Sequence, residues 1–239
     1  MRRSASKKTG QSNSTTASIT SSATDLFRSS SSKASSKEME RIDNLFYSYA
    51  NRSSGMIDPE GIETLCSDME VDHTDVRILM LAWKMRAEKQ GYFTLEEWRQ
   101  GLKSLRADTL NKLKKALPDL EKEVKRPSNF VDFYNYAFRY CLTEEKQKSI
   151  DIESICQLLD LVLGSHFQAQ VDYFIEYLKI QSDYKVINMD QWMGFYRFCN
   201  EFPSQGKAEE KLERINLFRH WLKLSVDPSL YDTNVSALA

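Results

Sequence analysis

LMLAWKMRAEKQGYFTLEEW, residues 79–98, reads as the end of one amphipathic helix, a short turn and the start of another helix. Apolar residues recur at helical spacing before the turn, and Thr94 and Glu97 have the spacing of a capping box after it. Gly91 suits a tight turn, and the pair Tyr92-Phe93 favours a short extended segment. The stretch therefore predicts a helix–loop–helix unit.

This order of elements is the outline of a calcium-binding EF-hand, and it recurs along the chain. Residues 38–105 contain the helix–loop–helix pattern twice, and residues 128–202 contain it twice again. Each loop includes a short apolar segment of β type, at Met56-Ile57, Tyr92-Phe93, Ile150 and Val186-Ile187. Two such segments can pair, and no alternating run is long enough for a larger sheet. We predict an all-α fold made of two pairs of degenerate, calcium-free EF-hand-like units.

The loops lack the residues that bind calcium, which needs oxygen ligands at loop positions 1, 3 and 5 and a glutamate at position 12. With Gly91 at position 6, Glu97 falls at position 12, but Arg86 places a cation at position 1. With Gly55 at position 6 of the earlier loop, position 12 is Gly61. We therefore expect no metal site and no other cofactor, and we interpret Glu97 as a helix-capping residue.

Local signals mark the expected helix ends. A capping box that begins at Ser35 predicts the start of the first helix. Asp58 and Asp151 are predicted N-caps of later helices, and Gly164 is the expected C′ residue of the helix that Asp151 begins. Pro118 is expected to break or kink a more polar helical connector.

Composition divides the 239 residues into three parts. Residues 1–36 are rich in Ser and Thr and carry six basic residues and one acidic residue, which predicts a disordered basic tail. Residues 37–202 are the expected folded domain, and residues 203–239 form a C-terminal segment with helical spacing over 207–224. Beyond the tail the chain has 27 basic and 33 acidic residues, which suits a basic protein partner and argues against nucleic acid.

The basic tail is open to three readings: a plain solvated tail, a weak nuclear signal in MRRSASKK, or an organelle transit peptide. No apolar run approaches the roughly 20 residues of a membrane span, so we expect no membrane partner.

No pattern of residues predicts an active site. His73, His166 and His220 are scattered, and the nucleotide-binding glycine motifs and the H-E-x-x-H zinc motif are absent. The four cysteines lie far apart, which is typical of reduced thiols rather than of a disulfide framework. We therefore expect a protein that binds partners and is not an enzyme.

Six strings follow one another along the chain: GIETLCSDMEVD, ILMLAWKMRA, GYFTLEEW, LKKALPDLEKEVKRPSNFVDFYNYAF, LDLVLG and MDQW. In this order they resemble the defective-in-cullin-neddylation (DCN1-like) family and its potentiating neddylation domain. The resemblance spans roughly residues 38–200. It implies a non-catalytic accessory ligase that holds a cullin together with a neddylation-conjugating enzyme charged with a ubiquitin-like modifier.

The resemblance also implies an apolar pocket for the acetylated N-terminal methionine of the conjugating enzyme. The matching positions are Ile62, Ile78, Leu81, Ala82, Gln90, Phe93, Tyr140, Leu158 and Leu161. The same residues could equally be ordinary core. Gly91 stands where relatives often carry a cysteine, so the floor of the pocket is expected to differ.

For the cullin, the resemblance implies an acidic patch that meets the basic winged-helix C-terminal region. Asp190 matches the first acid of that patch. The others belong to a segment with an A-W-P string that this sequence lacks, so an atypical or truncated C-terminus is expected.

The leading hypothesis is therefore a monomeric scaffold of the nucleus and cytoplasm that promotes cullin neddylation and contacts the modifier indirectly. One alternative is an isoform that binds the conjugating enzyme but is defective in cullin binding. An alternative of another class is an EF-hand-type calcium-dependent adaptor.

Overall fold

A computed structural model describes residues 20–201, with side chains described from residue 35 onward. Residues 1–19 and the C-terminal segment, including the helix expected over 207–224, lie outside the described residues. The described elements, in chain order, are α1 (Thr20–Tyr49), α2 (Pro59–Met69), α3 (Val76–Met85), α4 (Leu95–Leu105), α5 (Leu110–Val124), α6 (Pro127–Tyr140), β1 (Ser149–Asp151), α7 (Ile152–Ile180), β2 (Val186–Asn188) and α8 (Met189–Glu201). The prediction of an all-α fold is confirmed.

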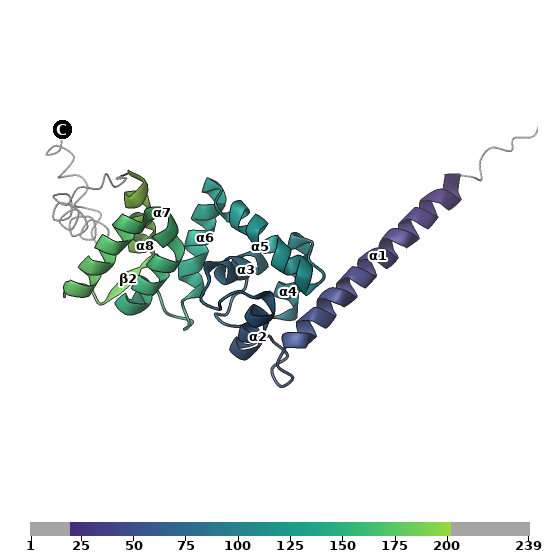
Figure 1. The fold of residues 1–239 in the computed structure, drawn as a ribbon, viewed down its shortest axis with the longest axis horizontal. Coiled ribbons are helices and arrows are strands. Elements are labelled where there is room, and N and C mark those ends of the chain that lie inside the picture. Colours follow the sequence, from purple (N-terminus) through teal and green to yellow (C-terminus); the bar gives the residue numbers. More distant parts are fainter. Residues whose placement is uncertain (1–19, 202–239) are drawn as a thin grey trace, which may run out of the picture.

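The helices form two lobes along the length of the body, and the N-terminal part of α1 projects away from them (Figure 1). In the first lobe, α3 packs against α4 and α5, while α1 packs against α2 and α4. In the second lobe, α6 packs against α7 and α8. Because α3 and α5 also contact α6, these three helices form the junction between the lobes.

The short apolar segments of the loops pair as expected. Ile57 and Phe93 form an antiparallel bridge, with Ile57 N–H to Phe93 O at 3.0 Å and Phe93 N–H to Ile57 O at 2.9 Å. In the second lobe, β1 and β2 are antiparallel and Ile150 lies opposite Ile187. The pairing fixes the loops of each lobe back to back.

Three predicted N-terminal caps are confirmed by hydrogen bonds. The Asp58 carboxylate accepts the Gly61 N–H at 3.0 Å, and the Asp151 carboxylate accepts the Ser154 N–H at 2.9 Å. Thr94 and Glu97 form a reciprocal capping box at the start of α4. Side-chain oxygens thus satisfy N–H groups that the first helical turn leaves unpaired.

Two predicted helix boundaries, at Ser35 and Gly164, are wrong, and α5 does not break at Pro118. Helix α1 already begins at Thr20, so Ser35 lies inside it. Gly164 lies inside α7, whose irregular backbone comes later, at Phe167 (φ −135°, ψ 41°). Pro118 lies within α5, on an exposed face, while buried leucines on the opposite face hold that helix against the core. Tertiary burial thus overrides the local signals of Gly164 and Pro118.

Three helices of the first lobe end on a residue with left-handed backbone that is not glycine. These residues are Glu70 (φ 56°), Arg86 (φ 56°) and Arg106 (φ 53°). In each case the next residue donates its N–H back across the last turn, as Ala87 does to Ala82 O at 3.0 Å. The left-handed cap therefore satisfies helix carbonyls that would otherwise lack donors.

An aromatic pair ties α6 to α8 in the second lobe. The rings of Tyr134 and Trp192 stack with centroids 4.2 Å apart. Tyr134 Oη donates to Trp192 O at 3.0 Å, and Trp192 Nε1 donates to Tyr134 O at 2.9 Å. Both side chains are buried, so each polar atom needs such a partner.

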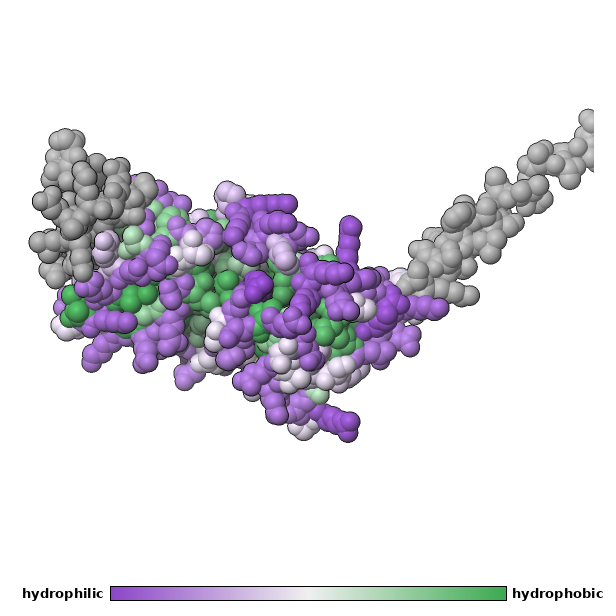
Figure 2. Space-filling view, viewed as in Figure 1, coloured by the Kyte–Doolittle hydropathy of each residue, from purple (hydrophilic) through white to green (hydrophobic). Residues whose placement is uncertain are grey.

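Hydrophilic side chains cover much of the face shown in Figure 2, and hydrophobic ones reach the surface in patches along the body. Among the helices of the described residues, none combines the length and the apolar character needed to cross a lipid bilayer.

Candidate functional site

The nine residues of the predicted peptide pocket come from both lobes and differ in exposure. Six are buried: Ile62, Leu81, Ala82, Phe93, Tyr140 and Leu158. Ile78 and Leu161 are half-buried and pack against the same apolar core, whereas Gln90 is exposed. The structure thus places eight of the nine in or against one packed core, and the pocket assignment stays a prediction.

The turn between α3 and α4, residues 86–94, carries Gln90 and Phe93 and is held from several sides. Arg86 caps α3, and Gly91 has a φ of 77°, a conformation that favours glycine. The Glu97 carboxylate accepts N–H groups from Glu88 at 2.9 Å and from Thr94 at 2.7 Å. Glu97 therefore does more than cap α4, because its second hydrogen bond folds the turn back onto the helix start.

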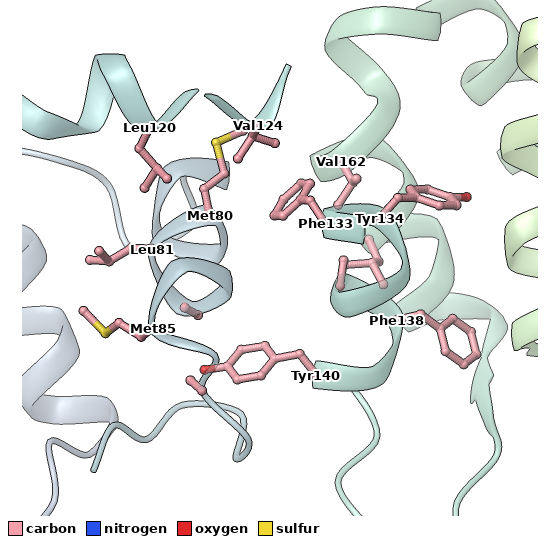
Figure 3. Close-up of a cluster of buried hydrophobic side chains, with 14 of the residues drawn as sticks. Met80, Leu81, Met85, Leu120, Val124, Phe133, Tyr134, Phe138, Tyr140 and Val162 are labelled. Atoms are coloured by element: carbon pink, nitrogen blue, oxygen red, sulfur yellow. The ribbon is translucent and has the colours of Figure 1, made fainter. Parts of the chain in front are cut away.

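Two tyrosines of α6 reach across the lobe junction to this turn. Tyr136 Oη donates to Ala87 O at 2.9 Å, and Gly91 N–H donates to Tyr140 Oη at 3.2 Å. Figure 3 shows the Tyr140 ring extending from the end of α6 toward the loop that follows α3. Burial raises the pKa of Tyr140 to about 12 and raises that of Tyr136 further, so both phenols are neutral at physiological pH.

The junction also has an apolar part and a cleft. Met80 of α3 and Phe133 of α6 face one another in Figure 3, and Phe133 meets the Trp83 ring edge-on with centroids 6.2 Å apart. Beside them α3, α4, α5 and α6 enclose a cleft of about 770 Å³. Its walls mix aromatic rings with charges such as the Lys84–Glu123 pair, joined at 2.6 Å. Tyr140 is the one predicted pocket residue that lines this cleft.

The predicted cullin-binding residue, Asp190, is exposed in the first turn of α8. Beside it Asn188 and Gln191 exchange hydrogen bonds between side chain and backbone at 3.0 and 2.9 Å, which caps the helix. The Asp190 carboxylate is therefore not needed for capping, although a negative charge in a first helical turn is favourable by itself. It is accessible to a basic partner.

Sequence reasoning missed Tyr136, Trp83 and Asp132 as residues of the lobe junction. The string NYAFRY places two tyrosines four residues apart, on one face of a helix, which was the available signal. Nothing in the sequence shows which loop that face would meet.

Comparison with known proteins bears on the same region. Residues 112–216 match the protein family described as "Cullin binding". Over 153 residues the chain is 40% identical to DCN1-like protein 4 of Homo sapiens. The matched region covers 64% of this chain and 51% of that protein. Over 153 residues it is 37% identical to DCN1-like protein 5 of Bos taurus, and the matched region covers 64% of this chain and 63% of that protein.

A third relative, DCN1-like protein 3 of Pongo abelii, is 33% identical over 176 residues, or 73% of this chain and 58% of that protein. The chain thus spans between about half and two thirds of the length of these relatives. The predicted resemblance to the DCN1-like family is confirmed over the part of the chain that these matches cover.

Proposed function

We propose that this chain promotes the attachment of a ubiquitin-like modifier to cullins as a scaffold without an active site of its own. It would bind the cullin and the charged conjugating enzyme at once, so that two bound partners react as if at high local concentration. The observation that carries the proposal is the match of residues 112–216 to the family described as "Cullin binding". The nucleus and the cytoplasm are the proposed locations.

The conjugating enzyme would be held by its acetylated N-terminal methionine at the predicted pocket. The apolar character of eight of the nine residues supports this choice. Acetylation would matter because it removes the charge of the terminal amine, and an unpaired charge is costly to bury among such side chains. The thioether of methionine suits an irregular apolar site.

The test of this pocket uses the full chain and an acetylated, methionine-led peptide, with affinity measured by calorimetry. Gln90→Arg places a cation at the predicted pocket, and because Gln90 is exposed the variant should fold. We expect its affinity to be at least about tenfold weaker. Asn44→Arg, at an exposed amide on α1, is the matched control and should bind as the wild type does.

The reaction is tested by reconstitution with the charged conjugating enzyme and a cullin C-terminal fragment. We expect the wild-type chain to accelerate transfer, and Asp190→Lys to weaken cullin binding because it repels a basic surface. Asp172→Lys, at another exposed acid of the second lobe, is the charge-matched control. Equal cullin binding by both variants would show that Asp190 is not part of the cullin interface.

The same assays separate the other hypotheses. A chain that binds the peptide but neither binds cullin nor accelerates transfer is the isoform defective in cullin binding. A micromolar calcium site found by calorimetry would favour the calcium-dependent adaptor and contradict the interpretation of Arg86.

A further inference from the structure

Three hydrogen bonds between the two lobes form a regular ladder. Trp83 Nε1 donates to Asp132 Oδ2 at 2.8 Å, Tyr136 Oη donates to Ala87 O at 2.9 Å, and Gly91 N–H donates to Tyr140 Oη at 3.2 Å. In all three the partners are 49 residues apart in the sequence. The ladder therefore advances by four residues on both chain segments at each rung.

A constant offset means that α3 with its following turn runs parallel to α6, in register. Four residues are close to one helical turn, so the three donors or acceptors of α6 lie on one face of that helix. The first rung joins the two helices, whereas the second and third join α6 to the α3–α4 turn, residues 86–94. The second lobe thus holds the turn of the first lobe through two phenol groups.

The other hydrogen bonds of the turn all lie inside the first lobe. They are the Arg86 cap, the Tyr92 N–H to Lys89 O bond, the Phe93 bridge and the bonds to the Glu97 carboxylate. The tip of the turn, residues 88–90, is exposed, and Gly91 adds backbone freedom. The two tyrosines are what fix the turn relative to α6 and α7, which supply Tyr140, Leu158 and Leu161 of the predicted pocket.

We infer that Tyr136 and Tyr140 are positioning residues, whose hydroxyl groups set the distance between the two walls of the peptide site. This inference rests on the proposed function. Tyr136 is outside the predicted pocket. Its hydroxyl bonds the turn at Ala87 O, and its ring stacks on that of Tyr140 with centroids 5.3 Å apart, a contact that phenylalanine would keep. With the rungs intact, Gln90 and Phe93 are already placed, and the peptide does not have to order them when it binds.

The test compares Tyr136→Phe, Tyr140→Phe and Trp83→Phe in the full chain. Each removes one rung and keeps an aromatic ring, and Trp83→Phe is the matched control because its rung does not reach the turn. Hydrogen exchange of the turn amides measures how firmly the turn is held. Calorimetry with the acetylated, methionine-led peptide measures the affinity of the peptide site. Thermal unfolding shows whether each variant remains folded.

Loss of one hydrogen bond should speed hydrogen exchange of the turn amides by about three- to tenfold in both tyrosine variants. It should weaken the affinity for the peptide by a similar factor. Trp83→Phe should change neither, even if it lowers the melting temperature as much. Unchanged peptide affinity in Tyr136→Phe overturns the inference, as does an equal loss of affinity in Trp83→Phe. If the wild-type chain binds no peptide, the proposed function fails, and exchange alone then decides whether the phenols hold the turn.

Discussion

The substitution Gly61→Ala tests how closely α1 and α2 approach one another. Gly61 lies in the first turn of α2 and is buried. A methyl group on its Cα would lie 2.3 Å from the carbonyl oxygen of Tyr49 and 3.0 Å from a methyl group of Ile57. Carbon and oxygen atoms normally approach to about 3.3 Å, so the Tyr49 backbone would have to move by about 1 Å.

Overpacking of this kind typically costs about 1–3 kcal/mol, and the obstacle here is backbone, which sets the cost near the upper figure. Replacing glycine by alanine in a helix returns up to about 1 kcal/mol. We therefore expect Gly61→Ala to lower the free energy of unfolding by about 2 kcal/mol, measured by urea denaturation followed by circular dichroism.

Gly164→Ala is the matched control, because its new methyl group would meet the Asp160 carboxylate at 2.9 Å. That group is the flexible end of a side chain on the helix surface and can turn aside. We expect Gly164→Ala to be neutral or to stabilise by up to about 1 kcal/mol. The reasoning is refuted if the two variants change the free energy of unfolding in the same direction by the same amount.

Three further predictions concern stability. The carboxylate of Asp108 accepts hydrogen bonds from Lys112 and Arg41, which lower its pKa from 3.8 to about 2. Because the pKa is lower in the folded state, the carboxylate stabilises the fold fully above pH 3.8, and this contribution is lost as the pH falls toward 2. Acid titration of unfolding should therefore show a shallower loss of stability over that range for Asp108→Asn than for the wild type. Thr94→Ala removes the cap of α4 and should lower the free energy of unfolding by about 1 kcal/mol in urea denaturation. Phe133→Ala removes a fully buried ring at the lobe junction and should cost about 3–5 kcal/mol, seen as a large fall in melting temperature.

Features of the fold that depend on neighbouring residues were predictable from the sequence. The caps at Asp58, Thr94 and Asp151 use side chains three residues from their partners, and the loop pairs follow from short apolar segments. The errors at Gly164 and Pro118 have the opposite origin. Each residue breaks helices in isolation, but buried side chains elsewhere on the same helix hold it in place.

The predicted pocket depends on the resemblance more than on any local pattern. The resemblance, rather than hydrophobic spacing, singled out Leu81 and Phe93, and the structure buries both. The rungs made by Tyr136 and Tyr140 could not be predicted, because the partner of a phenol on one helix depends on how two lobes dock. Such a contact becomes visible only when segments 49 residues apart are placed side by side.

The left-handed end of α3 shows how backbone strain can position a charge. A residue with a side chain pays about 1–2 kcal/mol in this conformation, which glycine would avoid. Arg86 adopts it, and Arg86 is one of the residues that line the cleft between the lobes. An engineer who replaced Arg86 by glycine would gain stability and lose the cation there. At position 86, a gain in fold stability is therefore coupled to the loss of a positive charge from the junction surface.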